Sequence, residues 1–505
     1  MYRIAIIILI SAQFLQAERL PLSCILENTR DYNRVIFSQH EVIDSTHFRV
    51  HFTIAEDDSI NHQGEWLNPQ TNVTYAESVL IEFEYSAIIL QQRGWTLPPP
   101  DCDESITDEL DANHCINFGG DSRYDIYLTP HGPGFAIPDR IHNIEPYTAG
   151  RTSYIFLSTM ANMHENYPSW GYYAIAHELH HAIQIAYAVS TTGSVGEYSY
   201  NAWFFEESAS YIENVVYPNA VHLQTMLGNC NVTTPLTYPD YDLNSGADLY
   251  QYRGALWLKF LVEAYGDSSI IKTLWDDYGL TATTEGVDMF RVYSDAVEGL
   301  ENVDVTLSEA YTEYGIWRYF TGGRAMPNRY FEEANQYCTS TTTPLTDEIL
   351  NIRTEWGSTY ILELPSVDTT LNIFTPNPIV FTTNVLTITG DTLESSIPLI
   401  IENEETSFQI SPPSNGSQFL LVTSGYSGNP NVVNPFYTFE SSSLPNGDVN
   451  NDDEINVLDV VILVQFVLQQ QFPDDNQFYN GDLNSDGQLN VLDVVQLLNV
   501  ILAEN

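Results

Sequence analysis

The spacing of apolar residues in the first part of the chain switches between two periods. Residues 49–54 (RVHFTI) alternate apolar and polar positions, as a half-buried strand does, whereas residues 77–95 (ESVLIEFEYSAIILQQRGW) have the apolar spacing of an amphipathic helix. Two further apolar runs, residues 124–130 (YDIYLTP) and 153–159 (SYIFLST), predict strands. This order predicts a mixed sheet that leads into a helix at residues 173–184 (YAIAHELHHAIQ).

The next part of the chain has helical spacing. Residues 203–217 (WFFEESASYIENVVY), 253–266 (RGALWLKFLVEAYG) and 307–322 (LSEAYTEYGIWRYFTG) each predict a helix of a bundle-like half. Together with the sheet that precedes them, these helices predict one α+β domain over residues 18–340.

The composition changes near Ser340, where a Thr-rich stretch begins. The short apolar runs that follow, separated by Pro, Asn, Gly and Asp, predict a small all-β, sandwich-like domain over residues 350–440, and the Ser-rich residues 441–446 predict a linker. At the other end, residues 1–17 (MYRIAIIILISAQFLQA) predict a secretory signal peptide. We therefore expect a secreted or cell-surface protein. No membrane insertion is expected, because no later run is long enough to span a bilayer.

Residues 447–505 contain an internal repeat. Residues 447–468 (GDVNNDDEINVLDVVILVQFVL) recur at 481–502 (GDLNSDGQLNVLDVVQLLNVIL), an offset of 34 residues, and each copy joins an acidic loop to an apolar helix. Each loop has the ligand order of a calcium-binding EF-hand loop, with a backbone carbonyl at position 7, whereas a merely solvated acidic tail would not repeat this spacing. The predicted ligands of two calcium ions are Asp448, Asn450, Asp452, Glu454, Asn456 and Asp459 in the first loop, and Asp482, Asn484, Asp486, Gln488, Asn490 and Asp493 in the second.

Duplicated calcium loops that are each joined to one helix resemble a dockerin module, and the match covers nearly all of residues 447–502. The resemblance implies an all-α calcium-binding domain and a cohesin-like partner on a scaffold or cell surface. Two features depart from the family pattern. Asp453 stands where the loop turn usually takes Gly, and the pairs Val457–Leu458 and Val491–Leu492 replace the hydroxyl residues that many dockerins use to recognise cohesin.

The helix predicted at residues 173–184 carries the pattern H-E-x-x-H. His177 and His181 are four residues apart, so they lie on the same face about 6 Å apart along the helix axis. Two such imidazoles, a third protein ligand and a water molecule make up a catalytic zinc site, and Glu178 lies where a general base would take a proton from that water. In a chain with 12 histidines, the pattern also arises by accident at roughly the few-per-cent level, so a second signal is needed.

That second signal is a carboxylate on the next predicted helix. Trp203, Glu206 and Ala209 form the pattern W-x-x-E-x-x-A, and the 24 residues between His181 and Glu206 allow a loop and a returning helix. Glu207 offers an adjacent carboxylate, and Glu206 is favoured because it alone occupies the ligand position of the pattern.

These motifs resemble the gluzincin metallopeptidases, in which one helix supplies H-E-x-x-H and a later helix supplies a glutamate. The runs WGYYAIAHELHHAIQ, GWTLPPPD, YDIYLTP and WFFEESASYIE are also similar to a group of secreted bacterial zinc metalloproteases, over about residues 75–265. The resemblance implies a zincin-like fold for residues 18–340 and a single zinc ion. It assigns the zinc to His177, His181 and Glu206, and the role of catalytic base to Glu178.

Other polar residues near these motifs are weaker candidates. His180 shares part of the face of His177 but breaks the ligand register, so we expect it behind a ligand or on the surface. Glu213 lies two turns beyond Glu206 and could orient a ligand histidine, although a solvated carboxylate is the commoner case. Tyr250 or Tyr252 could supply a phenol that stabilises an oxyanion, but in a chain with 32 tyrosines a structural role is expected for both. His131 and His142 have no register with the motif and are also expected to be structural.

Composition limits the partners. The formal net charge of −50 over 505 residues should repel nucleic acid and anionic membranes, and the hydrophobic content of 43% excludes wholesale disorder. A bridge between Cys102 and Cys115 is favoured because it closes a short loop, but five cysteines allow many pairings and leave one thiol over.

The sequence thus predicts a secreted zinc peptidase that hydrolyses protein or peptide substrates through a zinc-activated water. Two hypotheses from other classes remain open. One is a non-catalytic zinc- or substrate-binding module, which the presence of Glu178 disfavours. The other is an adhesion or scaffold component whose β domain binds a surface or a carbohydrate.

Overall fold

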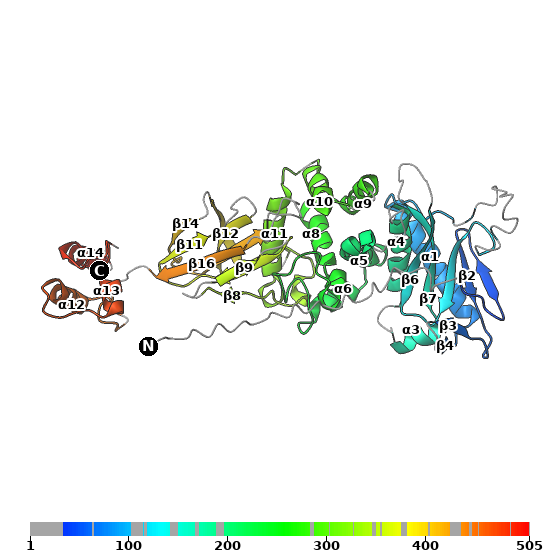
Figure 1. The fold of residues 1–505 in the computed structure, drawn as a ribbon, viewed down its shortest axis with the longest axis horizontal. Helices are drawn as coiled ribbons and strands as arrows, with labels where there is room; N and C mark the ends of the chain where they lie inside the picture. The colour runs from blue at the N-terminus through cyan, green and yellow to red at the C-terminus, as the bar shows by residue number, and fades with distance from the viewer. Residues whose placement is uncertain are drawn as a thin grey trace, which may run out of the picture. The chain divides into compact units, whose positions relative to one another are not determined.

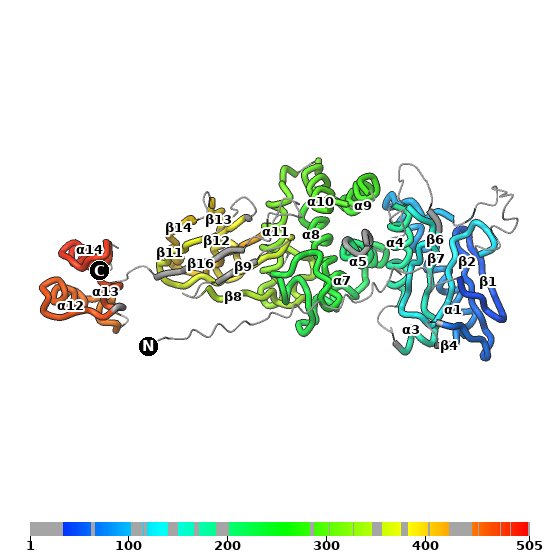
Figure 2. The backbone as a smooth tube through the Cα atoms, in the orientation of Figure 1, coloured from blue at the N-terminus to red at the C-terminus, as the bar shows by residue number. Residues whose placement is uncertain are grey.

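The structure is a computed structural model that describes residues 34–503 apart from short internal segments, and it divides into two compact units, Met1–Ser340 and Thr341–Asn505 (Figures 1 and 2). The predicted signal peptide, residues 1–17, and Cys24 lie outside the described residues. The internal segments left out are residues 63–64, 101, 103–114, 116–118, 142–149, 167–170, 188–195, 283–286, 302, 327, 346–349, 354–355, 375–380, 402–404, 425–435, 444–446, 453 and 485.

A five-stranded mixed sheet, in the order β1-β2-β5-β7-β6, forms the base of the first unit. The three central strands are parallel and coincide with the three predicted runs, whereas β1 and β6 pair antiparallel at the two edges. The edge strand β6 was not predicted, because Gly and Pro interrupt its apolar pattern. The strands are β1 (Glu41–Asp44), β2 (Phe48–Phe52), β5 (Tyr124–Thr129), β6 (Gly134–Ile141) and β7 (Arg151–Ser158), and β3 (Ile60–His62) pairs separately with β4 (Glu65–Leu67).

Two helices cover the central sheet. Helix α1 (Val73–Gln92) begins at Asn72, whose side chain accepts a hydrogen bond from a backbone N–H of the first turn, and it packs on β2. Helix α4 (Tyr173–Tyr187) packs on β6 and β7 and also contacts α1 (Figure 1). Nearly every residue of α4 is buried, because the sheet lies on one side of it and further helices lie on the other. A short helix, α3 (Met160–Asn166), precedes it.

The rest of the first unit is helical, as its spacing predicted. The run at 253–266 forms helix α8, which follows the short helix α7 after Gly254. The predicted disulfide between Cys102 and Cys115 is present, and an unpredicted one joins Cys230 to Cys338. The helices are α5 (Gly196–Val216), α6 (His222–Gly228), α7 (Tyr250–Arg253), α8 (Ala255–Tyr265), α9 (Ile270–Thr281), α10 (Met289–Glu298) and α11 (Leu307–Tyr319), with 3-10 turns η1 (Ala247–Leu249), η2 (Gly322–Arg324) and η3 (Ala334–Gln336).

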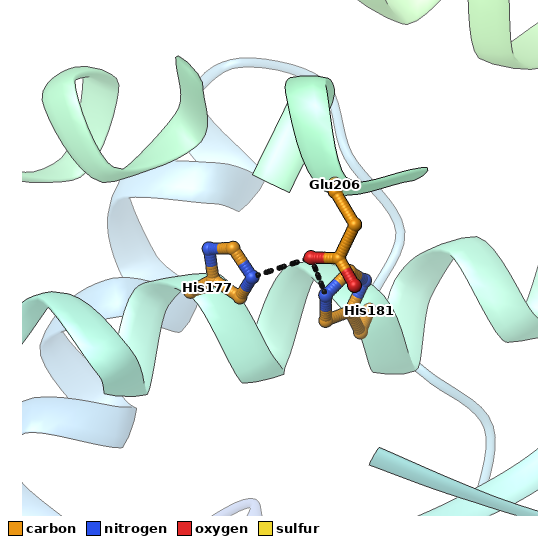
Figure 3. A group of neighbouring side chains, drawn as sticks. All are labelled: His177, His181 and Glu206. Carbon is orange, nitrogen blue, oxygen red and sulfur yellow. Dashed lines mark hydrogen bonds and ion pairs between the residues drawn. The ribbon is translucent and has the colours of Figure 1, made fainter. Parts of the chain in front are cut away.

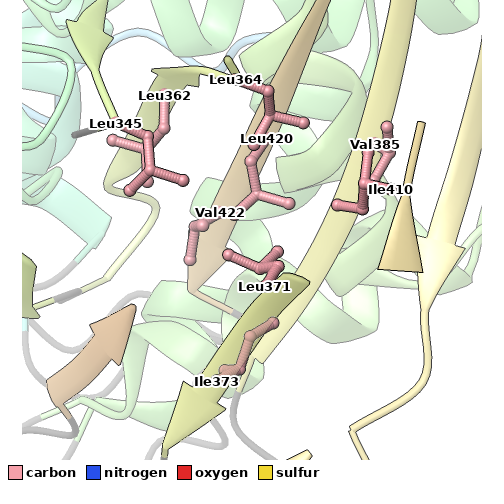
Figure 4. Packing of buried hydrophobic residues seen from close by; sticks show 9 residues of the cluster. All are labelled: Leu345, Leu362, Leu364, Leu371, Ile373, Val385, Ile410, Leu420 and Val422. Atoms are coloured by element: carbon pink, nitrogen blue, oxygen red, sulfur yellow. The ribbon is translucent and has the colours of Figure 1, made fainter. Parts of the chain in front are cut away.

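The second unit begins with two sheets, in the orders β13-β12-β15-β10-β8 and β14-β11-β16-β9. Aliphatic side chains from both sheets form one core, which Figure 4 shows. The strands are β8 (Thr343–Pro344), β9 (Leu350–Arg353), β10 (Thr359–Glu363), β11 (Thr369–Phe374), β12 (Phe381–Thr389), β13 (Thr392–Leu399), β14 (Glu405–Ile410), β15 (Ser417–Ser424) and β16 (Phe436–Ser443).

The predicted boundaries of this β domain, 350 and 440, are too narrow. The Thr-rich junction contains β8, which pairs with β10, and Leu345 lies in the core. The first half of the predicted linker is the end of β16, where Ser441 to Ser443 pair with β11. The serine content suggested a linker, but pairing with β11 uses backbone groups and does not depend on the side chains.

In the C-terminal segment, each copy of the repeat contributes one main helix. Helices α12 (Val457–Val467) and α14 (Val491–Ala503) pack together, and α13 (Asp475–Gly481) connects the two copies. Val449, Leu463, Phe466 and Leu497 form a small core. Among the described residues, no helix is both long enough and apolar enough to cross a bilayer.

Candidate functional site

Three polar side chains converge between α4 and α5. His177 and His181 come from one face of α4, and Glu206 comes from α5, with its carboxylate directed between the two imidazole rings (Figure 3). Glu206 Oε2 lies 3.2 Å from His177 Nε2 and 3.3 Å from His181 Nε2, and the potential ligand atoms of the three residues all lie within 4.8 Å of one another. All three side chains are fully buried.

The electrostatics of this group favour an anionic Glu206 carboxylate. Burial opposes ionisation of Glu206, but its close contacts with His181 and His177 lower its pKa to about 2. Burial lowers the pKa of His181, although the neighbouring Glu206 acts in the opposite direction. A neutral imidazole is the form that binds a metal.

Glu213 lies behind His177, where it can orient this candidate ligand. The alternative that we considered commoner, a solvated carboxylate, is wrong. It is buried, and its two oxygens accept hydrogen bonds from His177 Nδ1 at 2.8 Å and His222 Nδ1 at 2.6 Å. Burial opposes its ionisation, but the hydrogen bonds from both histidines lower its pKa. The prediction erred because α5 is enclosed on this side by α4 and α6, which brings His222 against it.

A second polar residue lies behind His181. Gln184 Oε1 is 2.6 Å from His181 Nδ1, and its Nε2 donates to the Phe205 carbonyl and to Ser208 Oγ. Neither Gln184 nor His222 was picked out from the sequence. The position of Gln184, one turn after His181 on the same helix face, is the signal that could have identified it.

Glu178 extends toward the edge strand β6. A Cβ atom built on Gly134, the first residue of β6, would lie 2.5 Å from Glu178 Cγ, so this close approach of strand and helix requires glycine. Glu178 is fully buried and follows His177, a candidate metal ligand, in the sequence. The carboxyl group therefore has a defined position at the start of β6.

Glu207, the rejected alternative ligand, points elsewhere. A Cβ atom built on Gly254 would lie 2.0 Å from Glu207 Oε1, which places this carboxyl against the junction of α7 and α8. Both of its oxygens lack a hydrogen-bond partner among the described residues, and burial raises its pKa well above the usual range. Adjacent residues of α5 thus have carboxyl groups in different environments.

His180 was expected either behind a ligand or on the surface, and the surface expectation is wrong. Its ring is fully buried and packs edge-on against Trp95, at 4.8 Å between centroids, and against Trp275, at 6.2 Å. Burial lowers its pKa well below the usual range. Because α4 is covered on all sides, even a helix face without ligands lies in the core.

The remaining weak candidates are dispersed. Tyr252 stacks on His177 at 5.9 Å between ring centroids, whereas Tyr250 is buried next to Tyr241. His131 is buried and stacks on Phe156, and His142 lies outside the described residues.

The two acidic loops of the C-terminal segment share one geometry. Asp459 and Asp493, the residues at position 12, are fully buried. In each loop the backbone N–H groups of positions 3 and 9 donate hydrogen bonds to this carboxylate. The distances are 3.0 and 2.8 Å in the first loop, and 3.3 and 2.8 Å in the second. Position 5 likewise donates its N–H to the position 1 carboxylate at 3.1 Å in both loops. Gly487 at position 6 has a φ of 78°, and Asp453, its counterpart, lies outside the described residues.

The comparisons with known proteins match two parts of the chain. Residues 446–502 match the dockerin type I domain. This segment is a dockerin. Residues 152–287, which include His177, His181 and Glu206, match a family described as "Family of unknown function (DUF6055)". No curated protein matches the chain.

The dockerin carries two further implications. Dockerin domains bind calcium, and a dockerin implies attachment to a cohesin partner in an extracellular assembly. Val457 and Leu458 in the first copy, and Val491 and Leu492 in the second, are each more than half exposed. The replacement of hydroxyl residues by these pairs therefore places apolar side chains on the surface, at equivalent positions of both copies.

Proposed function

We propose that the first unit is a zincin-like zinc peptidase that the dockerin attaches to an extracellular assembly. The observation that carries the proposal is the spacing of the candidate ligand atoms. A tetrahedral zinc ion with ligands at about 2.0–2.1 Å needs ligand atoms about 3.3–3.4 Å apart. The separations of 3.2 and 3.3 Å between Glu206 Oε2 and the two Nε2 atoms match that requirement, and the potential ligand atoms of all three residues lie within 4.8 Å of one another.

The chemistry of the donors agrees with this assignment. Two imidazole nitrogens and one carboxylate oxygen are a common protein ligand set of catalytic zinc. Glu206 Oε1 is buried and makes no hydrogen bond within the described residues. Unpaired polar atoms in protein interiors are costly, and a bound cation would compensate this one.

The residues around the ligands would perform the proton transfers. When bound, zinc would lower the pKa of a water molecule and polarise the carbonyl group of the substrate. Glu178, the residue that follows His177, would take the proton from the attacking water and pass it to the amine that leaves. Peptide-bond hydrolysis needs both transfers, and one carboxylate held in a fixed position can make them in turn.

The test compares two carboxylate-to-amide variants of the chain that begins at residue 18. Glu178→Gln removes the proposed base, and Glu77→Gln makes the same change on the exposed side of α1. Zinc is measured by atomic spectroscopy, and cleavage is measured on a library of peptides from a digested proteome. We expect about one zinc per chain in all three proteins. Turnover should fall by about a hundredfold or more in Glu178→Gln alone, and chelation should abolish it.

A non-catalytic zinc module is the second candidate, and complete burial of the three ligand residues and Glu178 favours it. The same experiment separates the two functions. One zinc per chain without cleavage of any library peptide would support the second candidate and refute the peptidase. Activity that survives in Glu178→Gln would refute the proposed role of that residue.

For the dockerin we propose that the exposed apolar pairs contact the cohesin partner. Residues 447–505 contain neither Lys nor Arg, so the apolar side chains stand on an acidic surface. A complementary partner would have an apolar face bordered by basic residues. Recognition by apolar burial would distinguish this dockerin from those that use hydroxyl groups.

A further inference from the structure

The amide of Gln184 can adopt only one of its two orientations. Its Nε2 lies 3.0 Å from the Phe205 carbonyl oxygen, which can only accept a hydrogen bond. It also lies 2.9 Å from Ser208 Oγ, whose own hydrogen is directed to the Phe204 carbonyl at 2.7 Å. Both neighbours on α5 therefore require the NH2 group of Gln184, and the amide oxygen must face away from α5.

This orientation determines the tautomer of His181. The amide oxygen of Gln184 lies 2.6 Å from His181 Nδ1 and can only accept, so the proton of the neutral ring must be on Nδ1. The lone pair is then on Nε2, the atom that lies 3.3 Å from Glu206 Oε2. A backbone carbonyl on α5 thereby decides which nitrogen of a residue on α4 is available to a metal.

The geometry points to Gln184 as a positioning residue for metal binding, which sets the tautomer of His181 and ties it to the segment that carries Glu206. Phe205 and Ser208 flank Glu206 in the sequence, so one side chain connects both helices that contribute ligands. Trp275 of α9 adds a hydrogen bond to Ser208 Oγ at 3.1 Å, which holds that anchor in place. This inference rests on the proposed zinc site but not on peptidase activity.

The first test measures the tautomer directly, without metal. Nitrogen-15 NMR of histidine-labelled, metal-free protein distinguishes a protonated Nδ1 from a protonated Nε2, and a His181→Ala sample assigns the signals. We expect a protonated Nδ1 on His181 in the parent and loss of this preference in Gln184→Met, which has a similar shape but no amide. Gln92→Met, the same change at an exposed position of α1, should leave the signals unchanged. A protonated Nε2 in the parent would overturn the inference.

The second test measures zinc affinity by competition with a chromophoric chelator. We expect the Kd to rise about 10- to 100-fold in Gln184→Met, as for other residues that orient metal ligands, and to stay at the parental value in Gln92→Met. Should Gln184→Met fail to fold, Gln184→Asn takes its place, because it keeps the amide but withdraws it by one methylene. An affinity within twofold of the parent would overturn the inference.

The two tests separate this inference from the proposed function. A parent that binds no zinc would refute the proposed metal site and, with it, the positioning role. A parent that binds zinc tightly but cleaves no peptide would refute only the peptidase. A cobalt-substituted sample adds a spectroscopic check, since the absorption bands of Co²⁺ should change in Gln184→Met but not in Gln92→Met.

Discussion

Gly134→Ala should separate metal binding from catalysis. The added methyl group would lie 2.5 Å from Glu178 Cγ, whereas ordinary contacts begin at 3.4 Å, so one of the two must move by about 0.9 Å (3.4 − 2.5). Helix α4 is packed on all sides and cannot retreat, so most of the shift falls on the Glu178 side chain. The backbone of Gly134 is not in the left-handed region, so alanine itself introduces no backbone strain there.

A displacement of about 1 Å in a catalytic group costs about a hundredfold in rate, which corresponds to about 2.7 kcal/mol of activation free energy. We therefore expect zinc content to stay near the parental value and kcat on a cleaved library peptide to fall about a hundredfold. Gly246→Ala is the matched control, because nothing lies within 4 Å of the Cβ it would add. Parental turnover in Gly134→Ala would refute the assigned position of Glu178. Loss of zinc would show that the perturbation extends to the ligands.

Four other outcomes are expected. His181→Ala should lose the zinc ion of the first unit, and unchanged stoichiometry would contradict the ligand assignment. The pKa of Glu207 is higher in the folded chain than in the unfolded one, so unfolding releases its proton, and Glu207 destabilises the fold increasingly as the pH rises above about 4.3. The melting temperature of Glu207→Met relative to the parent should therefore rise from pH 5 to pH 7. A difference that stays constant would refute this. Calcium should induce helix in the isolated segment 444–505, because its crowded carboxylates repel one another until an ion neutralises them, and circular dichroism that shows full helix in excess chelator would contradict this. Serine at both exposed pairs, Val457–Leu458 and Val491–Leu492, should weaken cohesin binding by at least about tenfold without changing calcium affinity, as calorimetry would measure.

Local patterns determined much of this protein in advance. The four-residue spacing of His177 and His181 brings two imidazoles to one side wherever a helix forms, because the helical repeat is a property of the backbone alone. The dockerin was readable for a similar reason, since all the predicted ligands of one calcium ion lie within 12 consecutive residues. The central strands and the main helices also coincide with their predicted runs, because each buries a periodic set of apolar residues.

Tertiary packing decided which polar residues surround the candidate metal site. Glu206 and Glu207 are adjacent carboxylates, and the direction in which α5 rests on α4 turns the first toward the histidines and the second toward Gly254. The same contact places Glu213 and Gln184 behind the ligand histidines and buries His180 between two tryptophans. Helix periodicity specifies which residues share a face, but it does not specify what that face meets. That depends on helices and strands distant in the sequence, which a single chain's local pattern does not encode.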